Sequence, residues 1–260
     1  RFMIKNLKEL LEHKELLMNL TFKELKLKYR NSVFGFVWSF LNPLLMLIIY
    51  TFAFKLILKV KIENFTVFML SGLLPWTFFQ SSVQMSTNSI VANANLIRKV
   101  YFPREIIPLS IILSNFVNFL ITLIVLFLAV VVFKVKVGIS LLFLPISLAL
   151  LLLFTIGLAL FLSSLNVLYR DISHFVEISF MAWFYVTPII YNLNMIPDKY
   201  RFLLLLNPMT LVIECIRAPL YSNSMPNAFY VGLLLIIDIL LIIVGSKVFK
   251  NIEKRFAEEI

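Results

Sequence analysis

The sequence has little of the residue types that build enzymatic and metal sites. It contains one cysteine, Cys215, so no disulfide can form within the chain. Its two histidines, His13 and His174, are far apart and in no metal-ligand spacing, so no structural metal is expected. Its six glycines cannot form the G-x-x-x-x-G-K-[ST] loop that cradles nucleotide phosphates. We therefore expect no cofactor in this chain and no ATP hydrolysis by it.

Charge is also absent from long stretches of the chain. No ionised side chain occurs within residues 31–54, 106–133 and 138–169. An α-helix rises about 1.5 Å per residue, and the hydrocarbon core of a bilayer is about 30 Å thick, so about 20 apolar residues span it. Apolar residues make up 61% of the chain and the mean hydropathy is +0.95. These features predict an integral membrane protein.

We expect an all-α fold with six membrane-spanning helices in a single domain of residues 1–260. Five spans are predicted within residues 33–191 and the sixth at 229–249, and the full set is 33–54, 65–82, 106–133, 139–167, 174–191 and 229–249. An even number of spans places both termini on one side. That side carries about twice as many Lys and Arg residues as the other, which predicts cytoplasmic termini.

Residues 1–30 are predicted to form an amphipathic helix that lies along the membrane surface. On a helix over 4–28, apolar side chains such as Leu10, Leu17 and Met18 fall on one side, and charged side chains fall largely elsewhere. Such a helix could serve as a membrane anchor alone, or it could also contact a cytoplasmic partner.

Residues 195–222, between the fifth and sixth spans, contain two apolar runs that are too short to cross a bilayer, 202–206 and 209–221. We expect short re-entrant helices on the external side, with their irregular backbone buried in protein. Glu214 and Arg217 are three residues apart and should pair on one helix face. A loose external loop is the alternative, but a loop would not need so many apolar side chains.

Polar side chains are rare inside the predicted spans, and each is therefore a candidate for function. Asp238, near the middle of the sixth span, could form a hydrogen bond between helices or subunits, or could belong to a transport path. The third span carries polar side chains at i+4 spacing that could join helices or line a hydrated path. They are Ser110, Ser114, Asn118 and Thr122.

Aromatic side chains are concentrated toward the outer half of the predicted bundle. They include Trp76, Phe78, Phe79, Trp183, Phe184, Tyr185 and Tyr191. Belts of Trp and Tyr at the membrane interface are common. The rings could instead stack on the apolar faces of sugars, and together with Trp38 they would then line the path of a polymer.

Three segments stand out when they are taken together. They are residues 29–44 (YRNSVFGFVWSFLNPL), residues 95–105 (NLIRKVYFPRE), and residues 187–191 (TPIIY) with 207–210 (NPMT). In this order they resemble the permease subunit of ATP-driven polysaccharide exporters, the ABC transporter group that includes O-antigen, teichoic acid and capsule transporters. The resemblance to O-antigen permeases is greatest.

The resemblance implies a non-catalytic permease in the bacterial inner membrane. Two copies of the chain would form a pore above two copies of a separate ATPase, which would hold ATP and Mg²⁺. The implied cargo is a polysaccharide linked to polyprenyl pyrophosphate. The net charge of +10 fits contact with anionic lipid and an acidic partner, and no nucleic acid is implied.

The resemblance also implies roles for particular residues. The loop after the second span would be the coupling helix that docks on the ATPase, with Asn95, Leu96, Ile97, Arg98, Lys99, Tyr101 and Arg104 as the candidate residues. Alternatively, its basic residues only fix the topology. Glu214 and Arg217 would belong to an external gate. From charge and position, Lys26, Lys28 and Arg30 are candidates to receive the pyrophosphate.

Other functions stay open at this point. The chain could export teichoic acid, capsule, or a smaller lipid or drug. A membrane-bound polyprenyl-dependent transferase would need carboxylates at the membrane face, for which Asp171 and Glu177 are the only weak candidates. A structural anchor for a cytoplasmic complex would not need re-entrant helices.

Overall fold

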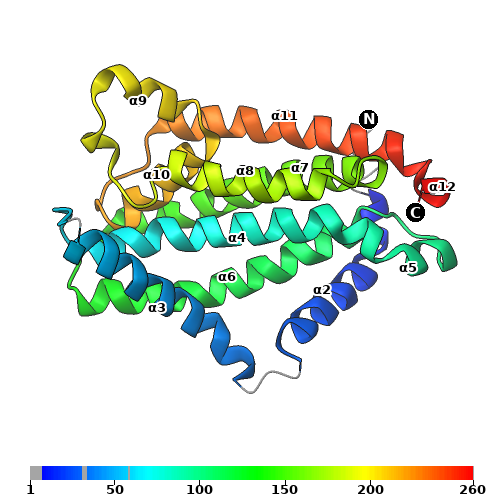
Figure 1. Cartoon of the computed structure of the whole chain (residues 1–260), viewed down its shortest axis with the longest axis horizontal. Helices are drawn as coiled ribbons and strands as arrows, with labels where there is room; N and C mark the ends of the chain where they lie inside the picture. The colour runs from blue at the N-terminus through cyan, green and yellow to red at the C-terminus, as the bar shows by residue number, and fades with distance from the viewer. Residues whose placement is uncertain (1–7, 31–33, 58, 260) are drawn as a thin grey trace.

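The long helices of this protein lie side by side in one bundle (Figure 1). The computed structural model describes residues 8–30, 34–57 and 59–259, and this part of the chain is helical with no strand. The start of α2 (Lys14–Tyr29) and α12 (Phe256–Glu259) lie at one end, which we call the terminal end. The opposite end, which carries α9 (Asp198–Leu205), we call the far end.

The central helix is α4 (Phe65–Ala92), which packs against α6 (Ile106–Val132), α7 (Leu144–Leu168), α8 (Ile172–Val186) and α10 (Pro208–Leu220). It continues ten residues beyond the span predicted at 65–82. The connection predicted between the second and third spans is shorter by the same ten residues. In its polar second half, hydroxyl groups bond to carbonyls of the helix itself and are therefore satisfied although they are buried. Thr87 Oγ1, for example, donates to the Val83 carbonyl at 2.7 Å.

The closest pairing of helices is between α7 and α11 (Ala228–Glu253), and it depends on two glycines. A Cβ atom on Gly245 would lie 2.5 Å from the Gly157 carbonyl oxygen, and one on Gly157 would lie 2.9 Å from Leu241 Cβ. Small residues let helix backbones approach closely where lipid surrounds them. The sixth predicted span is therefore fixed directly against the fourth.

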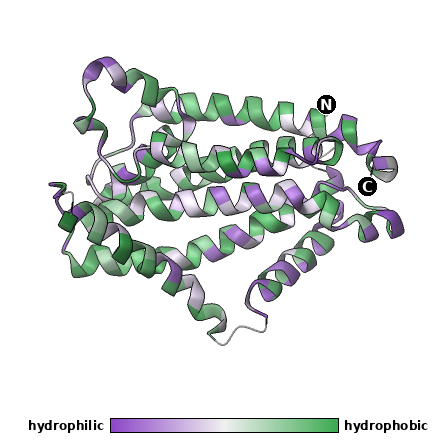
Figure 2. Cartoon of the chain, viewed as in Figure 1, coloured by the Kyte–Doolittle hydropathy of each residue, from purple (hydrophilic) through white to green (hydrophobic). Residues whose placement is uncertain are grey.

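Each predicted span contains a helix, and four helical segments among the described residues are long and apolar enough to cross a membrane. A fifth is added if α9 and α10, bent by 99° at their junction, form one broken span. Figure 2 shows hydrophobic residues along most of α7 and α11, and hydrophilic residues on α2 and α5 (Ala94–Lys99). The four segments are Gly35–Ile57, Ile106–Val132, Ile139–Leu168 and Ala228–Glu253.

The first predicted span is a continuous helical segment that lies at an angle to the bundle (Figure 1). It consists of η1 (Gly35–Val37), α3 (Trp38–Tyr50) and the π-helix η2 (Thr51–Ile57). The most apolar window of this segment is not buried by the rest of the chain at any residue. Residue 33, where the span was predicted to begin, lies outside the described residues.

The fifth predicted span, 174–191, is too long by five residues. Helix α8 ends at Val186, and Thr187 has an extended backbone (φ −90°, ψ 134°). The cause is Pro188, because a proline disfavours helical backbone in the residue before it. At 15 residues, α8 is about 22 Å long, which is less than the thickness of a bilayer core.

The N-terminal helix differs in detail from the predicted surface helix over 4–28. The regular helix α2 covers Lys14–Tyr29, and residues 1–7 lie outside the described residues. Its predicted apolar face is split, because Leu10 and Leu17 pack into the bundle while Leu11 and Met18 are exposed.

The two short helices predicted within 195–222 are present as α9 and α10, after the 3₁₀ turn η4 (Leu193–Met195). Helix α9 begins at Asp198, earlier than its apolar run. Helix α10 packs against α4, α7 and α11, so this segment is not a loose loop.

Candidate functional site

A cleft of about 630 Å³ lies between α2, α3, α4 and α6. Cavities of this size are typical of small-molecule sites. Each of α3, α4 and α6 contributes both polar side chains and apolar ones to its lining. The lining consists of Lys28, Tyr29, Trp38, Ser39, Asn42, Pro43, Met46, Leu73, Leu74, Thr77, Phe78, Ser81, Asn115, Asn118, Phe119 and Thr122.

A hydroxyl–amide cluster fixes the geometry of the cleft. The Tyr29 hydroxyl, in the last turn of α2, donates a short hydrogen bond to Asn118 Oδ1 on α6 and contacts the Ser39 hydroxyl. Ser39, at the start of α3, donates to the same Asn118 oxygen at 2.7 Å. The ends of α2 and α3 are thus joined to one amide of α6.

Lys28 provides the positive charge of the cleft. Its ammonium donates to Asn115 Oδ1 at 3.3 Å, and within the described chain it forms no ion pair with a carboxylate. The Asn115 amide nitrogen has only the Met85 thioether as an acceptor, at 3.6 Å. Desolvation by burial lowers the pKa of Lys28. Lys28, Lys26 and Arg30 are all exposed, and of these three residues, which were predicted to act together, only Lys28 lines the cleft.

The predicted polar stripe of the third span reaches the cleft only in part. Asn118 and Thr122 line it, whereas Ser110 and Ser114 are buried elsewhere. The physical reason is helical geometry, since each step of four residues drifts by about 40° around a helix of 3.6 residues per turn. Asn115 was missed by the i+4 pattern, and an i, i+3, i+7 pattern over Asn115, Asn118 and Thr122 would have found it.

The predicted aromatic residues fall into separate groups. Trp38 and Phe78 line the cleft. Trp76 and Phe79 are 1% and 0% exposed and belong to a packed ring cluster that includes Trp183, so they contact neighbouring rings rather than open space. Two further predicted residues lie near the far end: Tyr185 is exposed, and the Tyr191 hydroxyl donates to the carbonyls of Tyr185 and Val186.

At the far end, Asn207 holds the junction of α9 and α10 to the end of α8. Its side-chain oxygen accepts from Trp183 Nε1 at 2.8 Å and from the Met209 amide at 3.0 Å. Its amide nitrogen donates to Thr187 Oγ1 at 2.9 Å. Thr187 and Asn207, which are 20 residues apart in the sequence, therefore meet in the fold.

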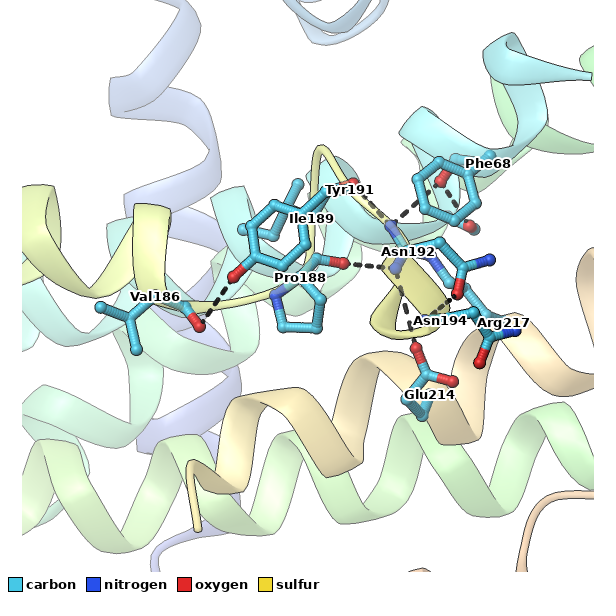
Figure 3. Close-up of polar contacts among 10 residues, drawn as sticks. Phe68, Val186, Pro188, Ile189, Tyr191, Asn192, Asn194, Glu214 and Arg217 are labelled. Carbon is cyan, nitrogen blue, oxygen red and sulfur yellow. Dashed lines mark hydrogen bonds and ion pairs between the residues drawn. The ribbon is translucent and has the colours of Figure 1, made fainter. Parts of the chain in front are cut away.

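Arg217 on α10 is a buried cation in the same region, with an exposed fraction of 3% (Figure 3). Its guanidinium donates to the carbonyls of Pro188, Ile189 (2.6 Å) and Phe68 (3.4 Å) and stacks 3.7 Å from the Phe68 ring centroid. The predicted pairing with Glu214 is present at 3.8 Å but is the longest of these contacts. Arg217 thus joins α10, the turn after α8, and α4.

Comparison with known proteins gives the relationship of this chain. Residues 15–221 match the ABC-2 type transporter family. The chain is 40% identical to an O-antigen export system permease protein of Klebsiella pneumoniae, over 94% of each of the two proteins. It is 33% identical to one from Myxococcus xanthus, over 99% of this chain and 100% of that protein. It is 21% identical to a polysialic acid transport protein of Escherichia coli, over 89% of this chain and 91% of that protein.

The chain belongs to the ABC-2 type transporter family. Together with its apolar helices, this membership makes it a multi-pass membrane protein and the membrane-spanning part of an ABC transporter. The earlier resemblance to polysaccharide export permeases is confirmed at the level of the family.

In this ABC-2 type chain, the predicted coupling segment is the six-residue helix α5 and the residues that follow it. Ile97 is buried and Leu96 half-buried, so these two attach the segment to the bundle. The outward side chains present two positive charges and an aromatic ring that is 99% exposed. They are Asn95, Arg98, Lys99 and Tyr101.

Arg104 faces inward to the end of α11 rather than outward with that group. Its guanidinium donates a short hydrogen bond to the Glu253 carbonyl, and its backbone amide donates to Glu253 Oε1 at 3.2 Å. Lys250 pairs with Glu253 at 3.3 Å and with Glu9 at 3.8 Å. Sequence reasoning missed these contacts because residues 104 and 253 are distant in the chain.

Glu105 lies beside this charged cluster and has an exposed fraction of 3%. Its Oε1 atom has no hydrogen-bond partner among the described residues. Burial raises the pKa of Glu105 to about 7, against the opposing effect of Lys250.

Asp238 is fully buried in α11, and neither carboxylate oxygen has a hydrogen-bond partner within the described part of the chain. It lies outside the lining of the cleft. Asp171 and Glu177 are exposed, and among the described residues no three His, Cys, Asp or Glu side chains are grouped as metal ligands.

Proposed function

We propose that this chain is the permease subunit of an ABC exporter that moves a polyprenyl-pyrophosphate-linked polysaccharide, of the O-antigen type, across the bacterial inner membrane. One observation carries the proposal. The chain is 40% identical over 94% of its length to a protein named as an O-antigen export permease. Similarity over nearly the whole of both chains includes the helices that enclose the cleft as well as those of the far end.

We place six spans in the membrane, with both termini in the cytoplasm. Helix α4 supports the second span, since its 28 residues extend about 42 Å and exceed the thickness of a bilayer core. Helix α8 and the turn after it would form the fifth. On this topology α9 and α10 are re-entrant on the external side, because Arg217 and Asn207 fix both of them to the turn after α8.

Two copies of the chain would form the pore and two ATPase subunits would drive it. The exposed side chains of α5 support a docking surface at the terminal end. Because Ile97 is buried in the bundle while Arg98 and Lys99 project from it, a push on this segment would reach α4 and α6. ATP and Mg²⁺ would bind only in the partner.

Export from cells tests the proposal. A strain that lacks its own O-antigen permease would receive this chain together with the ABC ATPase encoded beside it. Surface polysaccharide should return, and it should be lost when the phosphate-binding lysine of the ATPase is replaced. Export without any ATPase, or ATP hydrolysis by the purified chain alone, would sink the proposal.

Reversal of charge on the outward side chains of α5 tests the coupling role. Arg98→Glu combined with Lys99→Glu should uncouple ATP hydrolysis from export while leaving the chain folded and in the membrane. Unchanged export would favour the alternative that these residues only fix the topology. The double change Lys134→Glu and Lys136→Glu, at two exposed sites in another connection, is the matched control.

A further inference from the structure

We propose that Arg104 is a positioning residue that ties the coupling segment to the last turn of α11, so that a movement of this segment displaces the sixth predicted span as well as α4 and α6. The coupling segment is residues 94–104, which comprise α5 and the residues that follow it. This inference deepens the proposed function, on which it rests for the ATPase that would move the segment. Arg104 would then transmit movement within the chain rather than contact the ATPase.

The chain itself connects the coupling segment to two helices only. Helix α4 ends at Ala92, just before the segment, and α6 begins at Ile106, just after it. Glu253, at the end of α11, lies 149 residues beyond Arg104. A movement of the segment can therefore reach α11 only through contacts that form in the folded chain. Packed side chains and hydrogen bonds are the contacts that carry such coupling.

Arg104 makes two hydrogen bonds to Glu253, the last residue of α11. Its guanidinium donates a short bond to the Glu253 carbonyl, and its backbone amide donates to Glu253 Oε1 at 3.2 Å. The last carbonyls of a helix have no donor within the helix, and a cation there also interacts favourably with the helix dipole. Lys250 pairs with the Glu253 carboxylate at 3.3 Å and restricts its position. Two bonds from one residue fix both the position and the direction of the helix end.

Apolar packing surrounds these hydrogen bonds, so they are not an isolated surface contact. The Arg104 guanidinium lies 5.8 Å from the centroid of the Phe256 ring, and that ring lies 5.4 Å from the ring of Phe249. Both rings are 0% exposed. Ile97 and Phe102, on the coupling segment, are buried in the same apolar cluster as the two rings. A close-packed cluster is hard to compress and therefore transmits a displacement.

Helix α11 is in turn fixed to α7 by the contact between Gly157 and Gly245. A Cβ atom on Gly245 would lie 2.5 Å from the Gly157 carbonyl oxygen, so the two backbones meet without a side chain between them. Gly245 precedes Glu253 by about 12 Å along the axis of α11. The end of α11 cannot shift far without moving α7. A displacement that Arg104 passes to α11 would thus reach the fourth predicted span too.

Arg98 and Lys99 do not share these contacts, although sequence alone grouped them with Arg104. Both are exposed, and neither forms an ion pair within the described part of the chain. Their charges can meet a partner protein, whereas Arg104 already donates to Glu253. The coupling segment thus has an outer side suited to docking and an inner side suited to transmission.

Hydrogen exchange of the purified chain in detergent, followed by mass spectrometry, tests the link itself. Arg104→Met keeps an unbranched side chain but removes the guanidinium donors. Amides in residues 247–253 should exchange about tenfold faster, because one hydrogen bond to a charged group no longer opposes local opening. Arg104→Lys keeps a charged donor and should exchange more nearly like the native chain. Arg255→Met is the matched control and should leave these rates unchanged, since Arg255 is exposed and forms no ion pair among the described residues.

The complex with the ATPase encoded beside the chain tests transmission. Hydrogen exchange is measured in nanodiscs with and without a non-hydrolysable ATP analogue. In the native complex the analogue should change exchange both in the coupling segment and in residues 247–253. In Arg104→Met the first change should remain and the second should be lost. Export by the complemented strain should fall by about 2- to 30-fold at an unchanged rate of ATP hydrolysis, the range for residues that couple distant sites. Arg104→Lys should restore part of this export.

Three results would overturn the role of Arg104. The first is native exchange of residues 247–253 in the isolated Arg104→Met chain, because the hydrogen bonds would then not hold the end of α11. The second is an ATP-dependent change in α11 that persists in this variant, or a parallel loss of hydrolysis and export, as expected of a merely structural residue. The third is a native complex in which the analogue leaves the coupling segment unchanged. Failure of the proposed function is recognised separately, as absence of export by the native chain with its ATPase.

Discussion

Arg217 and Lys28 are both basic residues that bond to other helices, but Arg217 is 3% exposed and Lys28 is an exposed residue at the cleft. The terminal nitrogens of Arg217 reach three backbone carbonyls and a carboxylate, and its plane stacks on Phe68. Lys28 reaches one neutral amide beside an open cleft. A buried cation surrounded by acceptors of its own chain is part of the fold. An exposed cation with one neutral partner stays hydrated and contributes much less to the fold.

The difference also separates the two ends of this permease. The far end is closed by fixed contacts between backbone and side chain, which makes α10 part of a rigid unit with α4 and the turn after α8. The cleft is bordered by the ends of α2 and α3, which are held to α6 through side chains alone. The second arrangement can adjust around a bound molecule at lower cost than the first.

The largest effect is expected from Arg217→Met. It would leave the carbonyls of Pro188 and Ile189 without donors and Glu214 without its cation. Breaking a buried charge network in this way costs on the order of 3–5 kcal/mol. Thermal unfolding in detergent should show a strong loss of stability. The control is Arg201→Met, whose exposed ion pair with Asp198 at 2.9 Å should contribute about 1 kcal/mol or less. If both variants lost the same amount of stability, the buried contacts of Arg217 would be worth no more than an exposed ion pair.

Glu105 is also a buried ionisable residue. Its Oε1 atom has no hydrogen-bond partner among the described residues, and it does not line the cleft. Its pKa of about 7 is above that of an exposed carboxyl, so the ionised form destabilises the fold. That penalty is complete above pH 7, declines as the pH falls through 7, and vanishes below about pH 4.5.

Glu105→Gln should therefore stabilise the chain at pH 8 by on the order of 3 kcal/mol, with the gain fading toward pH 5. Unfolding midpoints measured at both pH values check this. Glu12→Gln, at an exposed position near the same end, should give no such pH-dependent difference. A gain of the same size at pH 5 and pH 8 would show that titration of Glu105 is not the cause.

Much of this fold could be predicted because it depends on local properties of the sequence. Uncharged apolar runs placed α6, α7 and α11 to within a few residues, and an N-P pair marked the start of α10. The errors arose where a local signal competed with another. Pro188 ended α8 early despite apolar residues beyond it, and α4 continued through a polar segment whose hydroxyl groups find acceptors within the helix.

The site was harder to predict because it joins residues that are distant in the chain. Lys28 and Asn118 were predicted individually, but nothing in the sequence shows that Lys28 meets Asn115, 87 residues away. Likewise, the spacing of Glu214 and Arg217 predicted their pairing, whereas the carbonyl partners of Arg217 depend on tertiary packing. The roles predicted for the α5 residues and for Asp238 stay predictions.

A smaller effect is expected from Gly72→Ala, which tests the space around Arg217 rather than its charge. The new Cβ would lie 2.7 Å from Arg217 Nη2 and 3.3 Å from Ile189 Cα. Overpacking of this kind costs about 1–3 kcal/mol. Gly232→Ala is the control, since no atom lies within 4 Å of its Cβ position. If both variants unfold at the native temperature, the guanidinium is not held as tightly as its contacts indicate.

The smallest effect on stability is expected from Lys28→Gln, and this prediction completes the comparison. Its single hydrogen bond is worth about 1 kcal/mol, and removal of a partly desolvated charge offsets part of that loss. The free chain should therefore unfold within about 1 kcal/mol of native stability. Thermal unfolding of the native chain and of the variant in detergent checks this. If Lys28→Gln instead destabilised the chain as strongly as Arg217→Met does, Lys28 would be a structural residue like Arg217 and the contrast between the two cations would be wrong.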